Sequence, residues 1–576
     1  MVKLSVLALD YDGTLTRHET LDPGMREAVA AARTAGITVI LVTGRILSEL
    51  QRVAGDLHFV DAVVAENGAV VHFPATGYTA MLAQPVPTVF VDELRARGVA
   101  HQAGQCLVDA SAADAPKLLE IIRRMELPLV LVFNAGRVMT MGQGVSKATG
   151  LHTLLDMLRL SAHNTVAIGD AENDHELLRL AEIGAAVEWG SAALRAAADT
   201  IVAGTDPSAV AAYIRALARA GAMPRPPRAR RRLRLGYTEA GREFSLAAHG
   251  RNVLIAGDAK SGKSWVAGLL CEQLILHGYC VCVLDPEGDY ASLEGLPGVA
   301  VLGGADPPPS PRDLARALRF PDRSVVIDLS RLPQDQKIEY VRGALPVINE
   351  VRRRTGLPHR VVVDEAHYFL HEPDVAELLD LELNGYTFVT YWASRLPPAL
   401  LAATEVIIVT RETSAAEIEA LRKWCGPCGA ANGERWAMLT RLETSQALAL
   451  PVTAETHGEL VMFTLGPRMT AHVRHREKYV DVPVSEDRAF VFAGDGPSRR
   501  VRTLRRFVAE LERPAASLAG HLTRGDFSRW VGDVFGDHAL ADDLRAIEQA
   551  PGATADPDVP ARMANAVRAR YDLAGE

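Results

Sequence analysis

The stretch GDAKSGKS, residues 257–264, constrains this chain more than any other stretch. It fits the pattern G-x-x-x-x-G-K-[ST] and lies between an apolar run and a helix-like run, which is the context that a phosphate-binding loop requires. Backbone N–H groups of such a loop wrap a phosphate, its lysine reaches the β- and γ-phosphates, and its hydroxyl binds Mg²⁺. The predicted nucleotide-contacting residues are Gly257, Asp258, Ala259, Lys260, Ser261, Gly262, Lys263 and Ser264.

A second nucleotide-site element lies further along the chain. Residues 360–363 form an apolar strand that ends in two carboxylates, Asp364 and Glu365. We expect Asp364 to hold the water shell of the metal, and Glu365 to polarise an attacking water. Together the two elements predict a domain that binds ATP and Mg²⁺ and hydrolyses the nucleotide.

The composition is that of a globular protein with several domains. A length of 576 residues suffices for about three or four domains, each with its own core. Lys and Arg number 62 against 71 Asp and Glu, a net charge of −9, so any nucleic-acid-binding surface must be local. The chain has no apolar run long enough for a bilayer, and we expect neither a signal peptide nor a disulfide framework. We therefore expect a cytoplasmic protein without membrane contact.

Two carboxylates follow an apolar strand near the N-terminus. Asp10 and Asp12 come directly after residues 4–9 and point the same way from the strand's end. Such a pair suits one nucleophile and one acid/base beside a metal, although an Asp-Gly turn after a core strand is the alternative. Three later elements favour the catalytic interpretation: a strand that ends in Thr43, Lys147 at a helix start, and a strand that ends in Asp170, Asn173 and Asp174.

This set of motifs resembles the haloacid dehalogenase-like (HAD) phosphatase superfamily over residues 1–205. The resemblance implies that Asp10 is a nucleophile that forms an aspartyl-phosphate, and that Asp12 is the acid/base. It implies that Thr43 and Lys147 hold the phosphoryl oxygens. For the Mg²⁺ site it implies Asp10, the carbonyl of Asp12, and Asp170, with Asn173 and Asp174 as supporting residues.

A long insertion between Thr43 and Lys147 predicts a cap. It mixes expected strands at 86–91 and 129–133 with an expected helix at 115–125, and it follows the sequence Glu66-Asn67-Gly68-Ala69. These features resemble the α/β cap of the Cof-type branch, which closes over small phosphorylated metabolites. The resemblance therefore favours a small substrate, such as a sugar phosphate, over a protein or a DNA end.

The second domain resembles the HerA/FtsK branch of RecA-like motor ATPases. Apolar strands alternate with helical stretches, which predicts a parallel sheet, and the sequence D-P-E-G-D-Y from Asp285 matches an acidic signature of that branch. Asp285 is therefore added to the predicted nucleotide site. Members of the branch pump or unwind DNA as hexameric rings, so the resemblance implies a homo-oligomer and a DNA partner.

The chain departs from that branch at one position. Where the family commonly has a Gln that senses the γ-phosphate, this chain has Ser394. Arg411, just beyond a core strand, is the predicted finger presented to a neighbouring subunit, and Arg395 is the alternative.

Three further stretches have less specific interpretations. Residues 424–428 copy a thioredoxin redox motif but follow a helix-like segment, so a structural role is favoured. The basic stretch from Arg468 to Lys478 is the candidate DNA-contacting patch. The Pro- and Arg-rich residues 224–232 are interpreted as a solvated linker, with contact to nucleic-acid phosphates as the alternative.

The predicted fold class is a multidomain α/β protein. It comprises a HAD Rossmannoid core (1–76 and 142–205) with an α/β cap (77–141), a linker (206–235), a RecA-like P-loop NTPase domain (236–480) and a small helical C-terminal module (481–576). The predicted function is a Mg²⁺-dependent phosphatase joined to an ATPase. Two alternatives remain: a phosphatase gated or assembled by a nucleotide-binding domain without DNA work, and a polynucleotide kinase-phosphatase, against which the cap and the D-E-A-H strand argue.

Overall fold

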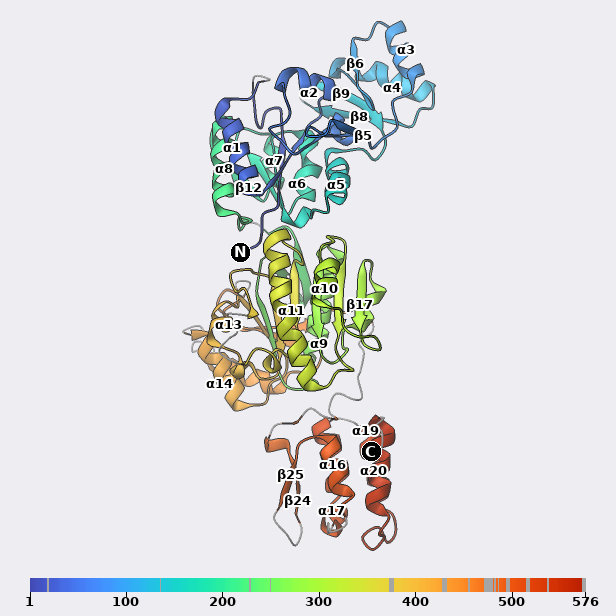
Figure 1. The fold of residues 1–576 in the computed structure, drawn as a ribbon, viewed down its shortest axis with the longest axis vertical. Coiled ribbons are helices and arrows are strands. Elements are labelled where there is room, and N and C mark those ends of the chain that lie inside the picture. Colours follow the sequence, from blue (N-terminus) through green and yellow to red (C-terminus); the bar gives the residue numbers. More distant parts are fainter. Residues whose placement is uncertain are drawn as a thin grey trace. The chain divides into compact units, whose positions relative to one another are not determined.

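The computed structural model describes all residues except 18–19, 135, 227–228, 249, 372–377, 427–432, 454–455, 471–479, 481–482, 485, 494–497, 514–517, 536–537 and 572–576. By its contacts, the chain divides into two units: residues 1–286 with 290–472, and residues 473–576 with 287–289. The first unit contains both large sheets (Figure 1). No helix among the described residues has the length and apolar character needed to cross a bilayer.

The first sheet has eight strands and is the HAD-like core. The order is β12 (Thr200–Val202), β11 (Ile183–Val187), β10 (Thr165–Gly169), β1 (Val6–Asp10), β2 (Thr38–Val42), β3 (Ala62–Ala65), β4 (Val70–Phe73) and β5 (Tyr78–Met81). Strands β12 to β3 are parallel, whereas β4 and β5 are antiparallel. The central strands are apolar throughout because helices cover both faces of the sheet.

Helix α8 (Pro207–Ala220) belongs to this core, although its residues were expected in the linker. Its apolar residues Val210, Ile214 and Leu217 are buried in the same cluster as Val29 of α1 (Pro23–Thr34). The HAD-like part therefore extends beyond residue 205, because the apolar face of α8 needs the sheet to cover it.

The cap is a four-stranded antiparallel sheet with two helices. The strand order is β6 (His101–Ala103), β7 (Leu107–Ser111), β9 (Arg137–Gly142) and β8 (Leu129–Asn134), and the helices are α3 (Thr88–Ala96) and α4 (Ala115–Arg124). The expected strand at 86–91 is wrong, because α3 begins at Thr88. Phe90 and Leu94, four residues apart, are both buried, so the period of this segment is that of a helix.

The second sheet has eleven strands. Its parallel centre is β21 (Val406–Val409), β15 (Val253–Ala256), β20 (Tyr386–Thr390), β19 (Arg360–Val363), β16 (Val281–Asp285), β18 (Ser324–Asp328) and β17 (Val299–Gly303). Strands β22 (Gln446–Ala449), β23 (Val461–Leu465), β13 (Arg232–Thr238) and β14 (Glu243–Ala247) extend it antiparallel beyond β21. The expected strands of the ATPase are thus present, but the sheet is mixed instead of wholly parallel.

Two arginines of the linker are bound to the HAD-like core. Arg230 and Arg231 donate to backbone carbonyls at the C-terminal end of α6 (His175–Leu180), and Arg230 also pairs with Asp199 at 2.6 Å. The last carbonyls of a helix have no partner within the helix, so guanidinium groups are suitable donors for them. The expectation of a solvated spacer is therefore wrong for these two residues.

The buried carboxylate of Glu182 joins the two sheets of the first unit. The hydroxyl of Tyr279 donates to both of its oxygens, at 2.8 and 3.0 Å, and Nδ1 of His163 lies 2.8 Å from Oε2. The rings of His163 and Tyr279 stack with centroids 3.7 Å apart. His163 precedes β10 of the first sheet and Tyr279 precedes β16 of the second. The contact therefore lies at the amino ends of strands in both sheets.

The second unit has a β-hairpin and several helices. The hairpin pairs β24 (Phe490–Phe492) with β25 (Arg499–Val501), and the helices are α16 (Leu504–Leu511), α17 (Ala519–Arg524), α18 (Asp526–Trp530), α19 (His538–Glu548) and α20 (Val559–Tyr571). Aromatic rings from the hairpin, α16 and α18 pack together, with Phe490 and Phe527 stacked at 5.2 Å. The module is largely helical as expected, with a hairpin that the sequence did not indicate.

We expect Tyr279→Phe to lower the midpoint of thermal unfolding of the full chain by about 2–5 °C, because the buried Glu182 carboxylate loses a hydrogen bond worth about 1–2 kcal/mol. Differential scanning calorimetry measures this midpoint. Tyr78→Phe, which removes the same hydroxyl from an exposed side chain, is the matched control and should leave the midpoint unchanged. Equal midpoints for Tyr279→Phe and wild type would show that the Tyr279 hydroxyl contributes nothing to the stability of the chain.

Candidate active sites

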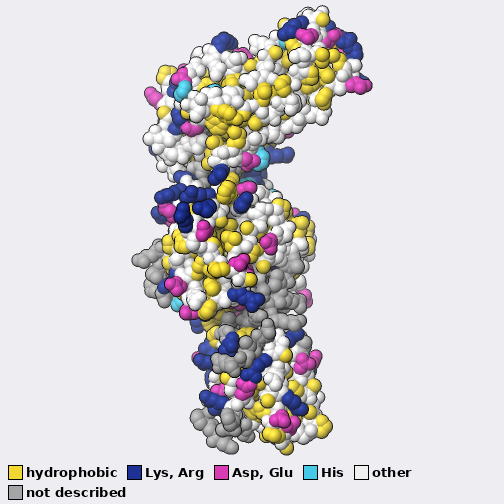
Figure 2. Space-filling model, turned by 45° about the vertical axis from the view of Figure 1, so that its right-hand side comes forward, with side chains coloured by type: hydrophobic (Ala, Val, Ile, Leu, Met, Phe, Trp, Pro, Cys, Tyr) yellow, Lys and Arg dark blue, Asp and Glu magenta, His cyan; other side chains and the backbone are white. Residues whose placement is uncertain are grey.

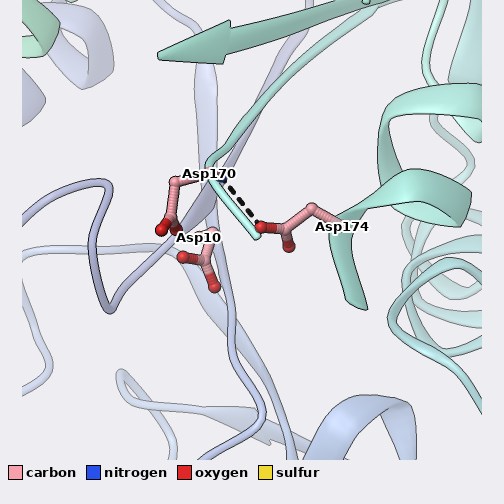
Figure 3. Close-up of side chains that lie close together, drawn as sticks. All are labelled: Asp10, Asp170 and Asp174. Atoms are coloured by element: carbon pink, nitrogen blue, oxygen red, sulfur yellow. Dashed lines mark hydrogen bonds between the residues drawn. The ribbon is translucent and has the colours of Figure 1, made fainter. Parts of the chain in front are cut away.

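Three carboxylates meet at the C-terminal edge of the first sheet. Asp10 ends β1, and Asp170 and Asp174 follow β10, which pairs with β1 in parallel with Leu9 opposite Ile168. One oxygen from each of the three carboxylates lies within 4.8 Å of the others. Figure 3 shows Asp10 and Asp170 side by side, with Asp174 accepting the backbone N–H of Asp170 at 3.0 Å. Parallel pairing thus creates the cluster that the sequence predicted.

The ammonium group of Lys147 lies among these carboxylates. Its Nζ donates to Asp10 Oδ1 at 2.5 Å and to Asp174 Oδ1 at 2.7 Å, and the side chain is buried. Lys147 is the first residue of α5 (Lys147–Leu158), where Ser146 caps the helix by accepting the N–H of Thr149. The helix start therefore fixes the lysine against the strand ends.

Burial and neighbouring charges shift the pKa values of the residues in this cluster. Burial and the neighbouring Asp174 raise the pKa of Asp10 well above its ordinary range, against the opposing effect of Lys147. Burial and Asp174 likewise raise the pKa of Asp170 to about 6. Burial lowers the pKa of Lys147, but the carboxylates of Asp10 and Asp174 outweigh it and raise this pKa above its usual value. The cluster holds excess negative charge that a cation would offset.

The donor set fits Mg²⁺, which prefers carboxylate oxygens. Asp174 already accepts hydrogen bonds from Lys147 and from the backbone N–H groups of Asp170 and Ala171, so it orients the loop. Asp10 and Asp170 are the residues suited to bind the ion directly. Gly13 has φ +78°, and a Cβ there would lie 2.2 Å from Asp170 Oδ2, so only glycine leaves room for this carboxylate.

Asp12 is held by an arginine that the sequence analysis did not single out. Arg45 donates to both carboxylate oxygens of Asp12, at 2.6 and 2.7 Å, and the Asp12 side chain is 43% exposed. Thr43, the first residue after β2, is buried, and its hydroxyl accepts the N–H of Arg45 at 3.1 Å. The position of Arg45, two residues after Thr43, was the available signal. This pairing keeps the Asp12 carboxyl at the solvent side of the cluster.

Glu66 and Asn67 connect the core to the cap. The carboxylate of Glu66 accepts the N–H groups of Gln105 and Cys106 at 3.0 and 2.7 Å. Asn67 accepts a hydrogen bond from Asn173 at 3.3 Å, which places Asn173 between the acidic cluster and the cap hinge. Both Glu66 and Asn67 have positive φ, at 52° and 54°. The role of Asn173 as a metal-site residue stays a prediction.

Part of the cap sheet packs against the core through apolar side chains. Met139 and Met141 of β9 are buried in one cluster with Leu107 and with Ile46 of the core. A Cβ on Gly44 would lie 3.3 Å from Met139 Sδ, so this methionine covers the turn that carries Thr43. Apolar side chains of the cap therefore cover this turn.

The phosphate loop links β15 to α9 (Lys263–Leu276) in the second sheet. Gly257 has φ +144°, and a Cβ there would lie 2.2 Å from Thr410 Oγ1. Gly262, with φ +104°, precedes the helix, and Lys263 Nζ donates to the carbonyl of Asp258 at 2.7 Å. The glycine positions and the helix start fit a phosphate group, and the roles of residues 257–264 stay predictions.

The acidic residues of the second site are buried at the strand ends. Asp364 and Glu365 follow β19, and Glu365 has φ +47°. Oε2 of Glu365 lies 3.6 Å from Nδ1 of His367. Asp285 ends β16, and its Oδ2 accepts the N–H of Tyr290 at 2.9 Å, which closes the D-P-E-G-D-Y turn. The parallel strands bring these carboxylates to the same edge as the phosphate loop.

Glu412 is a buried carboxyl group beside the phosphate loop that the sequence analysis missed. Burial and the Asp258 carboxylate raise the pKa of Glu412 to about 8. Its Oε1 accepts the N–H of Ser414 at 2.8 Å, and Thr413 donates to Asp258 at 2.8 Å. Glu412 is therefore mostly neutral at pH 7. It then adds no negative charge beside the loop, where such a charge would repel phosphate.

Arg411 lies next to the phosphate loop of its own chain. Its carbonyl accepts the N–H of Asp258 at 2.8 Å, so the residue follows β21 at the edge where the loop begins. The insertion of Arg411 into the nucleotide site of a neighbouring subunit stays a prediction. Ser264 is the second residue of α9, directly after Lys263, and its binding of Mg²⁺ also stays a prediction.

Arg468, the first residue of the candidate DNA-contacting patch, is not available to contact DNA. Arg468 is buried, and its Nε donates to Glu272 Oε1 at 2.8 Å, with its guanidinium 5.7 Å from the Trp265 ring. An arginine paired in this way is unable to face a nucleic acid. The rest of the patch, residues 471–478, and Cys428 of the redox-like motif lie outside the described residues. Basic and acidic side chains are interspersed over much of the face drawn in Figure 2.

Two family profiles match this chain. Residues 7–106 and 100–214 match the family described as haloacid dehalogenase-like hydrolase, and residues 248–343 match the family described as the central domain of helicase HerA. The expected fusion of a HAD-like part with a HerA-type part is therefore confirmed. The HerA match ends before Asp364 and Glu365.

Relatives of the first part include phosphoglycolate phosphatases. The protein from Natronomonas pharaonis is 34% identical over 226 residues, which cover 37% of this chain and 96% of that protein. The protein from Halorubrum lacusprofundi is 32% identical over 209 residues, which cover 34% and 90%. A solved haloacid dehalogenase-like hydrolase from Bacteroides thetaiotaomicron is 19% identical, and the similarity covers 37% of this chain and 100% of that one, with a TM-score of 0.34.

We expect the affinity for Mg·ATP to fall about three- to tenfold between pH 7 and pH 9, because Glu412 loses its proton near pH 8 and adds a negative charge beside the loop. Isothermal titration calorimetry on the full chain measures this affinity. Glu412→Gln should bind with nearly the same affinity at both pH values. Glu419→Gln, on the exposed face of α14 (Ala415–Trp424), should keep the wild-type pH dependence, and a flat wild-type profile would contradict the prediction.

Proposed function

Because the chain belongs to the haloacid dehalogenase-like hydrolase family through residues 7–214, we propose that this part is a Mg²⁺-dependent phosphomonoesterase, and that the second part hydrolyses ATP. The observation that carries the phosphatase proposal is the contact of Lys147 Nζ with both Asp10 and Asp174 at a sheet edge. This contact supports a site in which a nucleophile, a cation and an acidic cluster reach one phosphoryl group.

The proposed reaction has two displacements. A carboxylate oxygen of Asp10 attacks phosphorus, the ester P–O bond breaks, and Asp12 gives its proton to the leaving oxygen. Asp12 then takes a proton from water, whose oxygen attacks the aspartyl-phosphate and releases phosphate and the Asp10 carboxylate. Arg45 contacts both oxygens of the ionised Asp12, and one of these contacts would open when Asp12 carries the proton.

The residues around phosphorus share the negative charge. Lys147 and the hydroxyl of Thr43 are proposed to contact phosphoryl oxygens, and Asp10 and Asp170 to hold Mg²⁺. The ion, when bound, offsets the charge of the phosphoryl group and of the carboxylates. Asp174 keeps Lys147 and the loop of Asp170 in place through its hydrogen bonds.

A compact leaving group is proposed for the substrate. Met139, Met141 and Ile46 offer no hydrogen-bonding partners for the hydroxyls of a sugar, and they lie over the turn that carries Thr43. The relatives named above are phosphoglycolate phosphatases. We therefore propose 2-phosphoglycolate as the first substrate to test, ahead of the sugar phosphates that the cap type alone favoured.

The proposal for the second part rests on its phosphate loop and on the carboxylates at the same sheet edge. Lys263 begins a helix behind glycines that leave the backbone exposed to a phosphate, and Glu365 lies at the end of β19. Glu365 would polarise the attacking water, and Asp364 would orient the metal's water shell. A hexameric ring and DNA translocation rest on the HerA match alone, and native mass spectrometry with DNA-stimulated ATPase assays would test them.

We expect Asp10→Asn to lower kcat/KM for p-nitrophenyl phosphate and 2-phosphoglycolate by about a thousandfold or more, because an amide is a poor nucleophile toward phosphorus. Steady-state assays of the full chain with Mg²⁺ measure this loss. The control Asp22→Asn changes an exposed aspartate whose side chain makes no capping bond to α1, and it should keep wild-type activity. Near-normal turnover by Asp10→Asn would exclude the nucleophile assignment.

We expect Lys263→Ala to abolish ATP hydrolysis while kcat/KM of the phosphatase stays within about threefold of wild type, because the two sites lie on different sheets and share no residue. Parallel assays of both activities on one preparation test this, with Lys423→Ala as an exposed control. Loss of both activities in Lys263→Ala would instead favour a phosphatase gated by its nucleotide-binding domain.

A further inference from the structure

Tyr391 leaves the second sheet between the phosphate loop and the acidic residues of β19. Strand β20 pairs with β15 on one side, with Thr390 opposite Ala256, and with β19 on the other, with Phe388 opposite Val363. The phosphate loop follows Ala256 directly, and Asp364 follows Val363. The residue after Thr390 therefore emerges where these two elements meet.

The half-buried side chain of Tyr391 contacts groups from both elements. Lys263 Nζ lies 5.9 Å from the centroid of the Tyr391 ring, on the side of the phosphate loop. The ring of His367, whose Nδ1 lies 3.6 Å from Glu365 Oε2, packs against Tyr391 with centroids 4.2 Å apart. The hydroxyl of Tyr391 lies 3.5 Å from that of Tyr368. The phenol ring of Tyr391 thus lies between Lys263 of the phosphate loop and His367, which is next to Glu365.

Ser394 is at the position where related ATPases have a Gln that senses the γ-phosphate. In this chain it is hydrogen-bonded to Glu417. Its N–H donates to Glu417 Oε2 at 2.9 Å, and its hydroxyl donates to Oε1 of the same carboxylate. Glu417 is in the first turn of α14 and is buried. The Ser394 hydroxyl is therefore bound to that helix and is not directed at the loop.

We propose that Tyr391 distinguishes a nucleoside triphosphate from a diphosphate, with its phenol hydroxyl donating a hydrogen bond to the terminal phosphate. This inference rests on the proposed nucleotide site. The lysine of a phosphate loop reaches the β- and γ-phosphates, so a side chain beside Lys263 is at the height of the terminal phosphate. A phenol supplies one O–H donor, which takes the place of the amide N–H of a glutamine. Its packing against His367 connects this contact to the region of Glu365.

The test compares Mg·ATP and Mg·ADP binding to the full chain by isothermal titration calorimetry. Tyr391→Phe removes the hydroxyl and keeps the ring that packs against His367 and Lys263. We expect wild type to bind ATP more tightly than ADP, and Tyr391→Phe to bind ATP about tenfold more weakly with ADP affinity within about twofold, because a hydrogen bond to a charged group is lost. Ser394→Ala should change neither affinity.

The Mg·ADP affinity of each variant reports whether its second sheet is folded, because the phosphatase site lies on the other sheet and its rate would not detect a loss there. If Tyr391→Phe keeps the wild-type ratio of ATP to ADP affinity, or if wild type binds both equally, the inference is overturned while the nucleotide site stands. If wild type binds neither nucleotide, the proposed ATPase function fails, and this inference fails with it.

Discussion

Parallel strand pairing is the constraint on which both sites depend. In the first sheet, β1 pairs with β10 and β2, so Asp10, Asp170 and Thr43 reach one edge although they are far apart in the chain. In the second sheet, β15, β20 and β19 bring the phosphate loop, Tyr391 and the acidic pair to one edge in the same way. Parallel strands end at a common edge, and this geometry gathers functional side chains without any local sequence contact.

Buried charged groups at both ends of the strands require partners. Side chains from outside the strands supply these partners. Lys147 comes from a helix start and sits between Asp10 and Asp174. At the amino ends of the strands, Glu182 is surrounded by Tyr279 and His163, which join the two sheets. A carboxylate buried without such donors would cost several kcal/mol. The two sheets are therefore joined at the amino ends of their strands, whereas the predicted site residues follow the carboxyl ends.

The sequence was sufficient to predict which residues come together at the carboxyl ends of the strands in both sheets, and their roles stay predictions. Asp10, Lys147 and Asp170 stand at the ends of apolar strands or at a helix start, and the glycines of residues 257–264 follow a spacing that few other functions require. It was not sufficient for α3, which was expected to be a strand because its first turn is rich in β-branched residues. It was also not sufficient for α8, which was expected in the linker. It also misjudged Arg468, because a run of basic residues gives no sign of which of them a buried carboxylate will bind.

By itself the sequence determined most of the order of strands and helices apart from α3 and α8, the two predicted phosphate-binding motifs and the residue types at their ends, because these depend on local periodicity and on fixed spacing. Only the tertiary structure decided which distant side chains meet. The pairing of Arg45 with Asp12, the proton-holding environment of Glu412 beside Asp258, and the place of Tyr391 beside Lys263 arise from sheet order and register. Those contacts join residues from different elements, and the free energy that selects them comes from burial and charge compensation in three dimensions, which no single stretch of sequence contains.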